Sequence, residues 1–399
     1  MNVPKLRFKE FSDEYKYRNL SDISTLIKDG THGTHENYEN GIPLLSAKDI
    51  NNNKINIPEN CRKISVDDYN KIYKNYLLKK DDILLTIVGS IGRTALYKNE
   101  KVAFQRSVAT IRIDDNNNSN YIRQYIESPM IINQLNNMTN SSAQGGVYLS
   151  SLSKLNFDIP RKEEQLKIAN FLSLLDKKIE LQSKKIEGLK LFKKGLINIL
   201  NKKSYQETTL GKIGKFQTSS IDKLVKENEK IVNLYNYMDV YKHKIIMTQD
   251  LSKLSKTSAK DNQIITNNLK RGDILFTPSS ETPDDIGHSI CIQENLPNTV
   301  YSYHLLRYRP NIIIDPLFSN YYFNNSKIRK QIIRYATGAT RYTVSLDNFL
   351  KIKVDIPDLI TQKKYGLLLY STDKKVNKEM FKLNKLQELK KGLMQDMFV

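Results

Sequence analysis

Two long segments of the chain carry apolar side chains at heptad spacing. Residues 162–203 contain no proline, and their apolar positions form two rows with a period of 3.5 residues. The seam of this segment includes Leu175, Ile179, Gln182, Ile186 and Leu189, and the seam of residues 359–399 includes Val376, Glu379, Leu383 and Leu386. This pattern predicts two coiled-coil helices. A helix of about 40 residues would be roughly 60 Å long.

The two segments are copies of one unit. Residues 142–201 align with residues 339–398 at a fixed offset of 197 without a gap, and 18 of the 60 aligned positions are identical. The polar seam residues Gln182 and Glu379 occupy equivalent positions. Each variable region precedes its own helix, which favours antiparallel pairing of the two helices. In that arrangement we expect Gln182 to face Glu379, where a buried polar residue fixes register at a cost in stability.

The regions that precede the two segments also resemble each other, but the number of residues between matching motifs varies. "LKKDDILLT" at Leu78–Thr86 recurs as "LKRGDILFT" at Leu269–Thr277, and "SNY" at Ser119–Tyr121 recurs at Ser319–Tyr321. Drifting offsets indicate loops of different length on a shared scaffold. Strands are predicted at 82–88, 108–113, 272–277 and 304–310, and a helix is predicted with Ser119 as its N-cap.

These patterns predict an α+β fold with a pseudo-twofold internal repeat. Two mixed α/β recognition domains are separated by two long antiparallel coiled-coil helices. The expected order is domain 1 at 1–160, first helix at 161–203, domain 2 at 204–358 and second helix at 359–399.

Charge adds a partner class to this picture. The chain has 63 Lys and Arg against 43 Asp and Glu, which gives a net charge of +20. A positive excess favours a polyanion such as DNA, because each neutralised phosphate releases a counterion. A genome rich in A and T would also enrich lysine. The two cysteines, Cys61 and Cys291, fit buried thiols in a reducing cytoplasm, and no apolar run is long enough to predict a membrane span.

The whole chain resembles the specificity subunit of type I DNA restriction-modification systems. The segments that carry the resemblance are "DILLTIVGSIGRTA" (82–95), "AQGGVYLSSLSKLNFDIP" (143–160), "EEQLKIANFLSLLDKKI" (163–179), "GDILFT" (272–277) and "TGATRYTVS" (337–345). The second copy lacks the acidic pair at its helix start, which puts the contacts of that helix in doubt. The resemblance implies two target-recognition domains, each followed by a spacer helix, and a bipartite target whose unread spacer is set by the helices.

The resemblance also implies the partners and cofactors. The partners would be double-stranded DNA, two modification (methyltransferase) subunits and restriction (translocase/nuclease) subunits, and no membrane is involved. The chain itself would be non-enzymatic and would hold no cofactor, since S-adenosylmethionine, ATP and Mg²⁺ belong to the other subunits.

Catalytic motifs give little support to another function. The sequence contains no glycine-rich cofactor loop and no Walker loop. "DPLF" at Asp315–Phe318 approaches a methyltransferase motif but reads better as a strand-to-helix turn, and Asp358 with Glu388 and Lys390 matches a nuclease pattern by coincidence. The alternatives are a self-sufficient DNA methyltransferase or nuclease, and a coiled-coil scaffold without DNA specificity.

Candidate DNA-contacting residues are polar side chains on glycine-containing loops or helix starts. In the first domain they are Lys28, Thr31, His32, His35, Ser90, Arg93, Gln105, Arg106 and Gln144; in the second they are Ser219, Ser220, Ser279, Ser280, His304, Thr340, Arg341 and Tyr342. We expect Arg93, Arg106 and Arg341 to contact guanine or phosphate. Tyr342 can stack on a base or pack internally. His32 and His35 fit a DNA-facing loop better than a metal pair.

Overall fold

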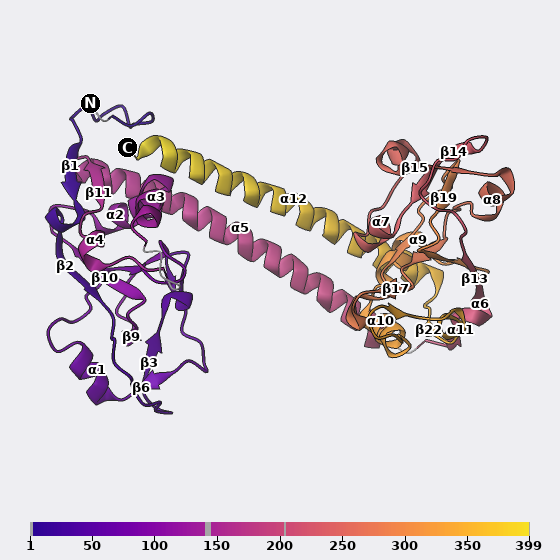
Figure 1. Cartoon of the computed structure of the whole chain (residues 1–399), viewed down its shortest axis with the longest axis horizontal. Helices are drawn as coiled ribbons and strands as arrows, with labels where there is room; N and C mark the ends of the chain where they lie inside the picture. The colour runs from indigo at the N-terminus through magenta and orange to yellow at the C-terminus, as the bar shows by residue number, and fades with distance from the viewer. Residues whose placement is uncertain (1–2, 140–144, 203–204, 399) are drawn as a thin grey trace. The chain divides into compact units, whose positions relative to one another are not determined.

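The structure is a computed structural model that describes residues 3–139, 145–202 and 205–398 (Figure 1). The chain forms two compact units. Unit 1 comprises residues 1–183 and 381–399, and unit 2 comprises residues 184–380. Each unit therefore contains one variable region together with half of each long helix.

Unit 1 is built around a four-stranded sheet of order β2-β10-β7-β8 and a three-stranded sheet of order β6-β3-β9; β1 pairs with β11 and β4 with β5. The strands are β1 (Lys16–Asn19), β2 (Ser24–Asp29), β3 (Ile42–Leu45), β4 (Ile50–Asn51), β5 (Lys54–Ile55), β6 (Lys63–Ile64), β7 (Ile83–Thr86), β8 (Thr94–Leu96), β9 (Ala103–Phe104), β10 (Val108–Ile113) and β11 (Asn156–Ile159). The short helices are η1 (Leu20–Asp22), η2 (Ala47–Asp49), α1 (Val66–Ile72), α2 (Ser119–Ile126), α3 (Pro129–Asn137) and α4 (Leu149–Leu152).

Unit 2 repeats the topology of the two larger sheets, with orders β13-β20-β16-β18 and β15-β14-β19, and β12 pairs with β22 as β1 pairs with β11. A further pair, β17 with β21, has no equivalent in the pair β4-β5. The strands are β12 (Glu207–Thr209), β13 (Gly214–Thr218), β14 (Lys230–Tyr235), β15 (Ser255–Ala259), β16 (Ile274–Phe276), β17 (Ser279–Ser280), β18 (Ser289–Cys291), β19 (Thr299–Tyr301), β20 (Leu306–Pro310), β21 (Tyr342–Thr343) and β22 (Lys353–Asp355). The short helices are α6 (Leu210–Ile213), α7 (Tyr237–Tyr241), η3 (Thr248–Lys253), α8 (Asp261–Thr266), η4 (Pro283–Asp285), α9 (Pro316–Tyr322), α10 (Ser326–Arg334) and α11 (Leu346–Leu350).

The repeat extends to individual contacts. In each unit a parallel pair of short strands lies in the three-stranded sheet, β3 with β9 and β14 with β19. An aspartate that is 1% exposed follows the same turn in both units: Asp82 binds Arg112, and Asp273 binds Arg309, through two charge-assisted hydrogen bonds each. The mixed α/β fold and the internal repeat predicted from the sequence are confirmed.

The predicted helix start at Ser119 is displaced by one residue. Asn118 is the N-cap of α2, and its side chain accepts a hydrogen bond from the Tyr121 amide. In unit 2 the N-cap is Asp315, and α9 begins at Pro316, so the second "SNY" lies inside α9. The two "SNY" tripeptides are therefore not structurally equivalent. The equivalent residues are the N-caps Asn118 and Asp315, which are 197 residues apart. The "DPLF" segment is a helix start, as expected.

The two long helices are α5 (Lys162–Lys202) and α12 (Leu359–Met397). In unit 1, Leu172 of α5 shares a core with Met394 and Met397, and Asp176 binds Lys390 at 2.5 Å. Residues further along α5 therefore contact residues that come earlier in α12. In unit 2 the same reversal holds, because Lys185 binds Glu379 and Lys193 binds Asp373. The predicted antiparallel pairing of the helices is confirmed within each unit.

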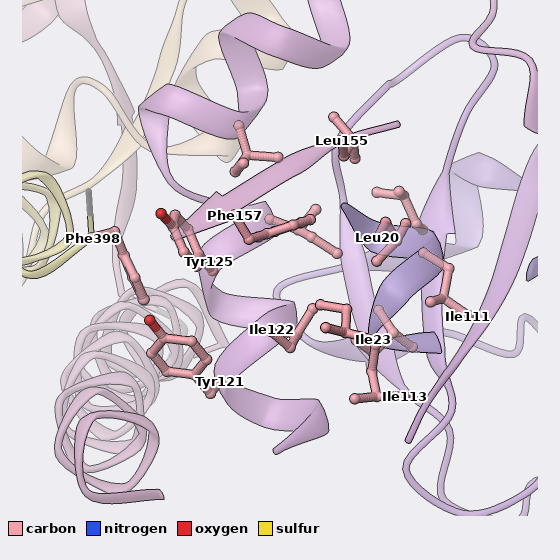
Figure 2. Close-up of a cluster of buried hydrophobic side chains, with 14 of the residues drawn as sticks. Leu20, Ile23, Ile111, Ile113, Tyr121, Ile122, Tyr125, Leu155, Phe157 and Phe398 are labelled. Atoms are coloured by element: carbon pink, nitrogen blue, oxygen red, sulfur yellow. The ribbon is translucent and has the colours of Figure 1, made fainter. Parts of the chain in front are cut away.

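The core of unit 1 joins the variable region to both long helices (Figure 2). Phe398, just after α12, stacks on Tyr125 with 4.5 Å between ring centroids, and Tyr125 also contacts Phe157 of β11 edge to face. Tyr121 and Tyr125 are fully buried. Burying such aromatic rings removes roughly 150–250 Å² of each from water, so this contact fixes the end of α12 to the variable region.

Candidate nucleic-acid interface

In unit 1 three of the predicted reader loops meet at one end of the four-stranded sheet. Thr31 and Gln105 form an isolated parallel bridge, and the Arg106 amide donates to the Thr31 carbonyl at 3.0 Å. Val88 and Gly146 form a second isolated bridge, which is antiparallel. Segments far apart in the sequence, following β2, β7 and β9 and preceding α4, are therefore held side by side by backbone hydrogen bonds.

A pocket of about 490 Å³ opens where these loops meet. It is lined by Asp29, His32, Ile87, Val88, Arg106, Gly146, Val147, Tyr148, Leu149 and Ser150. Its buried lining residues, Ile87 and Val147, are apolar, and its exposed lining residues carry polar groups, a combination that is usual in ligand sites. The Arg106 side chain is exposed, and Tyr148 is 66% exposed. The pocket therefore offers a cation, an aromatic ring and an acid–histidine pair to a ligand from solution.

The loop 31–35 is held by its own side chains. His35 Nε2 lies 2.8 Å from Thr31 Oγ1, which also accepts a hydrogen bond from the Gly33 amide. His35 Nδ1 lies 3.4 Å from Asp68, and the His35 side chain is 11% exposed. By contrast, His32 Nε2 lies 2.6 Å from Asp29 Oδ2 and the His32 side chain is 62% exposed. Of the two histidines, His32 is the one that faces solvent.

The other predicted residues of the first domain lie apart from the pocket lining. Lys28 is exposed on β2, and Gln105 is half-buried at the bridge. Ser90 and Arg93 lie in the turn between β7 and β8, where the Arg93 amide donates to Thr86 Oγ1 and the Arg93 side chain is exposed. Gln144 lies outside the described residues.

Unit 2 brings its predicted loops together in the same way. The Tyr303 amide donates to the Ile221 carbonyl, as the Arg106 amide donates to Thr31 in unit 1. The Val344 amide donates to Pro278, and β17 pairs with β21. Arg341 Nη2 donates to Ser279 Oγ at 3.3 Å.

The remaining candidates of the second domain differ in exposure. Thr340 and Arg341 are exposed, Tyr342 is half-buried in β21, and Ser280 is 3% exposed with its hydroxyl on the Thr282 carbonyl. Ser219 and Ser220 follow β13, with Ser219 Oγ accepting from the Ile221 amide and Ser220 Oγ accepting from Gln263. His304 lies beside these loops, and its pKa is lowered by burial and by the positive charges of Arg341 and Lys223.

An aromatic and histidine cluster adjoins this surface, and no sequence motif marked it. Tyr241 contacts His288 with ring centroids 4.7 Å apart, and His288 Nδ1 lies 3.4 Å from His243 Nε2. Tyr237 stacks on Tyr241 and donates its hydroxyl to the Ser279 carbonyl, which ties the cluster to the loop of Arg341. The cluster exists because α7 packs against β18, a contact between segments that the sequence does not link.

Equivalent positions in the two units carry different side chains. Backbone hydrogen bonds place Tyr303 where unit 1 has Arg106, and Asp222 where unit 1 has His32. Tyr303 is 53% exposed, whereas Asp222 binds Lys226 at 2.9 Å. One scaffold therefore presents two chemically different surfaces.

The nine predicted seam residues are half-buried or buried, and Ile186, Val376 and Glu379 are the most buried among them. The polar seam positions Lys193 and Lys390 each find an aspartate on the other long helix, Asp373 and Asp176 respectively. Lys185 Nζ forms an ion pair with Glu379 Oε1 at 3.2 Å. The expected facing of Gln182 and Glu379 stays a prediction.

The comparisons with known proteins agree with this architecture. The family model for the type I restriction modification DNA specificity domain matches residues 12–191. The chain is 21% identical to the putative type I restriction enzyme MjaX specificity subunit of Methanocaldococcus jannaschii, over 98% of this chain and 95% of that protein. The chain is therefore similar, over nearly its whole length, to type I restriction-modification specificity subunits. Members of this family are DNA-recognition components.

Solved structures support the fold of the specificity subunit. The S subunit of a type I restriction-modification system from M. genitalium matches with a TM-score of 0.60 and 16% identity, covering 100% of this chain and 99% of that one. A chain from a study of complex assembly and conformational transition of the type I R-M system matches with a TM-score of 0.53 and 11% identity, covering 96% and 97%.

The described residues contain no group of three side chains placed to hold a metal ion. Within the same residues, no helix combines the length and apolarity needed to cross a membrane. The side chain of Asp315 in "DPLF" caps α9, and its amide donates to Gln362. The Asp358 side chain accepts a hydrogen bond from the Thr361 amide at the start of α12, and Lys390 forms an ion pair with Asp176. These polar groups of the apparent catalytic motifs have structural partners.

Proposed function

We propose that this specificity subunit reads a bipartite, asymmetric DNA target through residues 1–160 and 204–358. The proposal rests chiefly on the repeated loop surface at the end of each four-stranded sheet, which carries Arg106 in one unit and Tyr303 at the equivalent place in the other. Because base edges are read by side chains on such loops, different side chains select different sequences. The two half-sites should therefore be unlike.

The long helices would set the unread spacer and hold the catalytic partners. Apolar side chains repeat on their exposed faces: Phe171 is 39% and Leu368 is 37% exposed, and Phe192 is 50% and Leu389 is 53% exposed. Each of these pairs is related by the offset of 197. A surface that occurs twice fits two copies of one partner, and two modification subunits match this stoichiometry. Restriction subunits would join this assembly, and a role on DNA would place the chain in the cytoplasm.

The chain itself would carry out no chemistry. Methyl transfer would use S-adenosylmethionine on the modification subunits, and translocation and cleavage would use ATP and Mg²⁺ on the restriction subunits. Calorimetric titration of S-adenosylmethionine into the isolated chain should give no binding. Saturable binding would instead support a self-sufficient methyltransferase.

Methylome sequencing tests the recognition role directly. Cells that express this chain with its modification subunit should methylate one motif made of two short, unlike half-sites around a spacer of fixed length. Methylation without such a motif, or none that depends on this chain, would contradict the proposal and favour a scaffold without DNA specificity.

A further inference from the structure

We propose that His32 and Arg106 together read one G·C base pair in the half-site bound by the first domain. This inference rests on the proposed function, because it names the bases that one of the two surfaces selects. The two side chains come from segments that are distant in sequence, and both line the pocket of unit 1. Each directly follows a member of the Thr31–Gln105 parallel bridge. Neighbouring strands lie about 4.8 Å apart, so the two side chains start from adjacent points on one rim.

Arg106 is available as a donor. Its side chain is exposed, and no described residue forms an ion pair or a side-chain hydrogen bond with its guanidinium group. The backbone, by contrast, is fixed, because the Arg106 amide donates to Thr31. A free guanidinium on a fixed backbone suits bidentate donation to the O6 and N7 atoms of guanine, the commonest specific contact in the major groove.

His32 is held as an acceptor. The carboxylate of Asp29, 2.6 Å from His32 Nε2, can only accept, so Nε2 carries the proton. In the neutral ring Nδ1 is then an acceptor. Asp29 is itself fixed, since it pairs with Ala109 in the sheet and its carbonyl oxygen accepts from the Tyr76 hydroxyl. Asp29 is therefore a positioning residue that sets which nitrogen of His32 faces the DNA.

This donor–acceptor arrangement matches a G·C pair. In the major groove guanine presents two acceptors, N7 and O6, and cytosine presents the N4 amino donor beside them. Arg106 would donate to guanine while His32 Nδ1 accepts from cytosine N4. An A·T pair would place the adenine N6 donor against the arginine. The second domain has Tyr303 and Asp222 at these places, so the same reading is not expected in its half-site.

Three substitutions test the reading, with methylation motifs measured for the full chain in cells that also express the modification subunit. Arg106→Gln should reduce the preference for guanine at one position of one half-site by about 10- to 100-fold and move it towards adenine, which Gln contacts. His32→Ala should weaken selection of the same base pair, and His32→Asn, whose amide oxygen is an acceptor, should restore part of it. Asp29→Asn should relax the same position without altering others.

Arg18→Gln is the matched control, because Arg18 is an exposed arginine of the first domain on β1, outside the pocket lining. It should leave the motif unchanged. Methylation that persists in the variants shows that they fold. A wild-type motif that is not bipartite would overturn the proposed function itself. A bipartite motif that Arg106→Gln leaves unchanged, or alters at the other half-site, would overturn only the reading by His32 and Arg106.

Discussion

Two buried glutamines connect each variable region to its long helix. Gln165 Oε1 accepts from the Asn118 amide, and Gln362 Oε1 accepts from the Asp315 amide, so each glutamine binds the N-cap residue of the equivalent helix, α2 or α9. Each also donates Nε2 to the carbonyl of the proline that ends "DIP". They are 1% and 2% exposed. Buried glutamine amides need hydrogen-bond partners within the protein, and these backbone groups provide them, which gives a physical reason for the glutamines' presence in both copies.

Gln165→Leu should lower the free energy of unfolding of the chain. The substitution leaves the Asn118 amide and the Pro160 carbonyl without this partner, at about 1–3 kcal/mol for each buried group. Denaturant unfolding measures the loss. Gln387→Ala, at an exposed position of α12, is the control and should change stability by less than about 0.5 kcal/mol. Equal effects of the two substitutions would show that the buried amide contributes nothing.

His288 should make the stability of unit 2 sensitive to acid. Burial is the main cause that lowers its pKa; the charge of Arg329 acts in the same direction, against a hydrogen bond to Asp285. Below an unfolded pKa of about 6.5 the unfolded chain binds more protons at this site, so stability falls as pH falls. The melting temperature should drop between pH 7.5 and 5.5, and should drop less in His288→Gln. An equal drop in both proteins would contradict this assignment.

At the scale of elements, α5 and α12 are aligned by a charge pattern that the repeat duplicates. Asp176 binds Lys390, and Lys193 binds Asp373; the two pairs are related by the offset of 197. The lysines occupy seam positions where an apolar residue would be expected. A lysine can lie there because the facing helix supplies a carboxylate, which also distinguishes the antiparallel register from shifted alternatives.

Asp176→Lys should destabilise unit 1 by about 1 kcal/mol or less, because it places two lysines together at a partly exposed site. The double variant Asp176→Lys with Lys390→Asp should recover most of the loss. Thermal unfolding of the wild-type, single and double variants gives the coupling energy. The same cycle at Lys193 and Asp373 should give a similar value, and the absence of recovery in both cycles would exclude the alignment role.

At the scale of the whole molecule, recognition and spacing should be separable. Exchanging residues 1–160 for the equivalent region of another specificity subunit should change one half-site and leave the other half-site and the spacer intact. The physical reason is that the reader loops of unit 1 are held by contacts within that region. Methylome sequencing of the chimaera shows which half-site changed. A change in both half-sites would contradict modular reading.

Lengthening the helices should change only the spacer. Seven residues, inserted in α5 between Ile168 and Leu196 and at the equivalent position of α12, add about two turns and about 10 Å, close to three base pairs. The heptad and the antiparallel register are preserved. The methylated motif should keep both half-sites and gain about three unread bases. An unchanged spacer would show that the helices do not set the distance.

The sequence by itself determined the repeat, the two long helices, the strands β7, β10, β16 and β20, and the family resemblance. Periodic apolar spacing and identities at a constant offset are local properties, and the physics of helices and strands converts them directly into elements. The cap at Ser119 was wrong by one residue because asparagine and serine both cap helices well. Only the tertiary structure decided which polar residues meet. Strand pairing brought His32 to Arg106, helix packing brought His243 to His288, and antiparallel alignment gave Lys193 its aspartate. Such contacts depend on long-range register, which no local pattern contains.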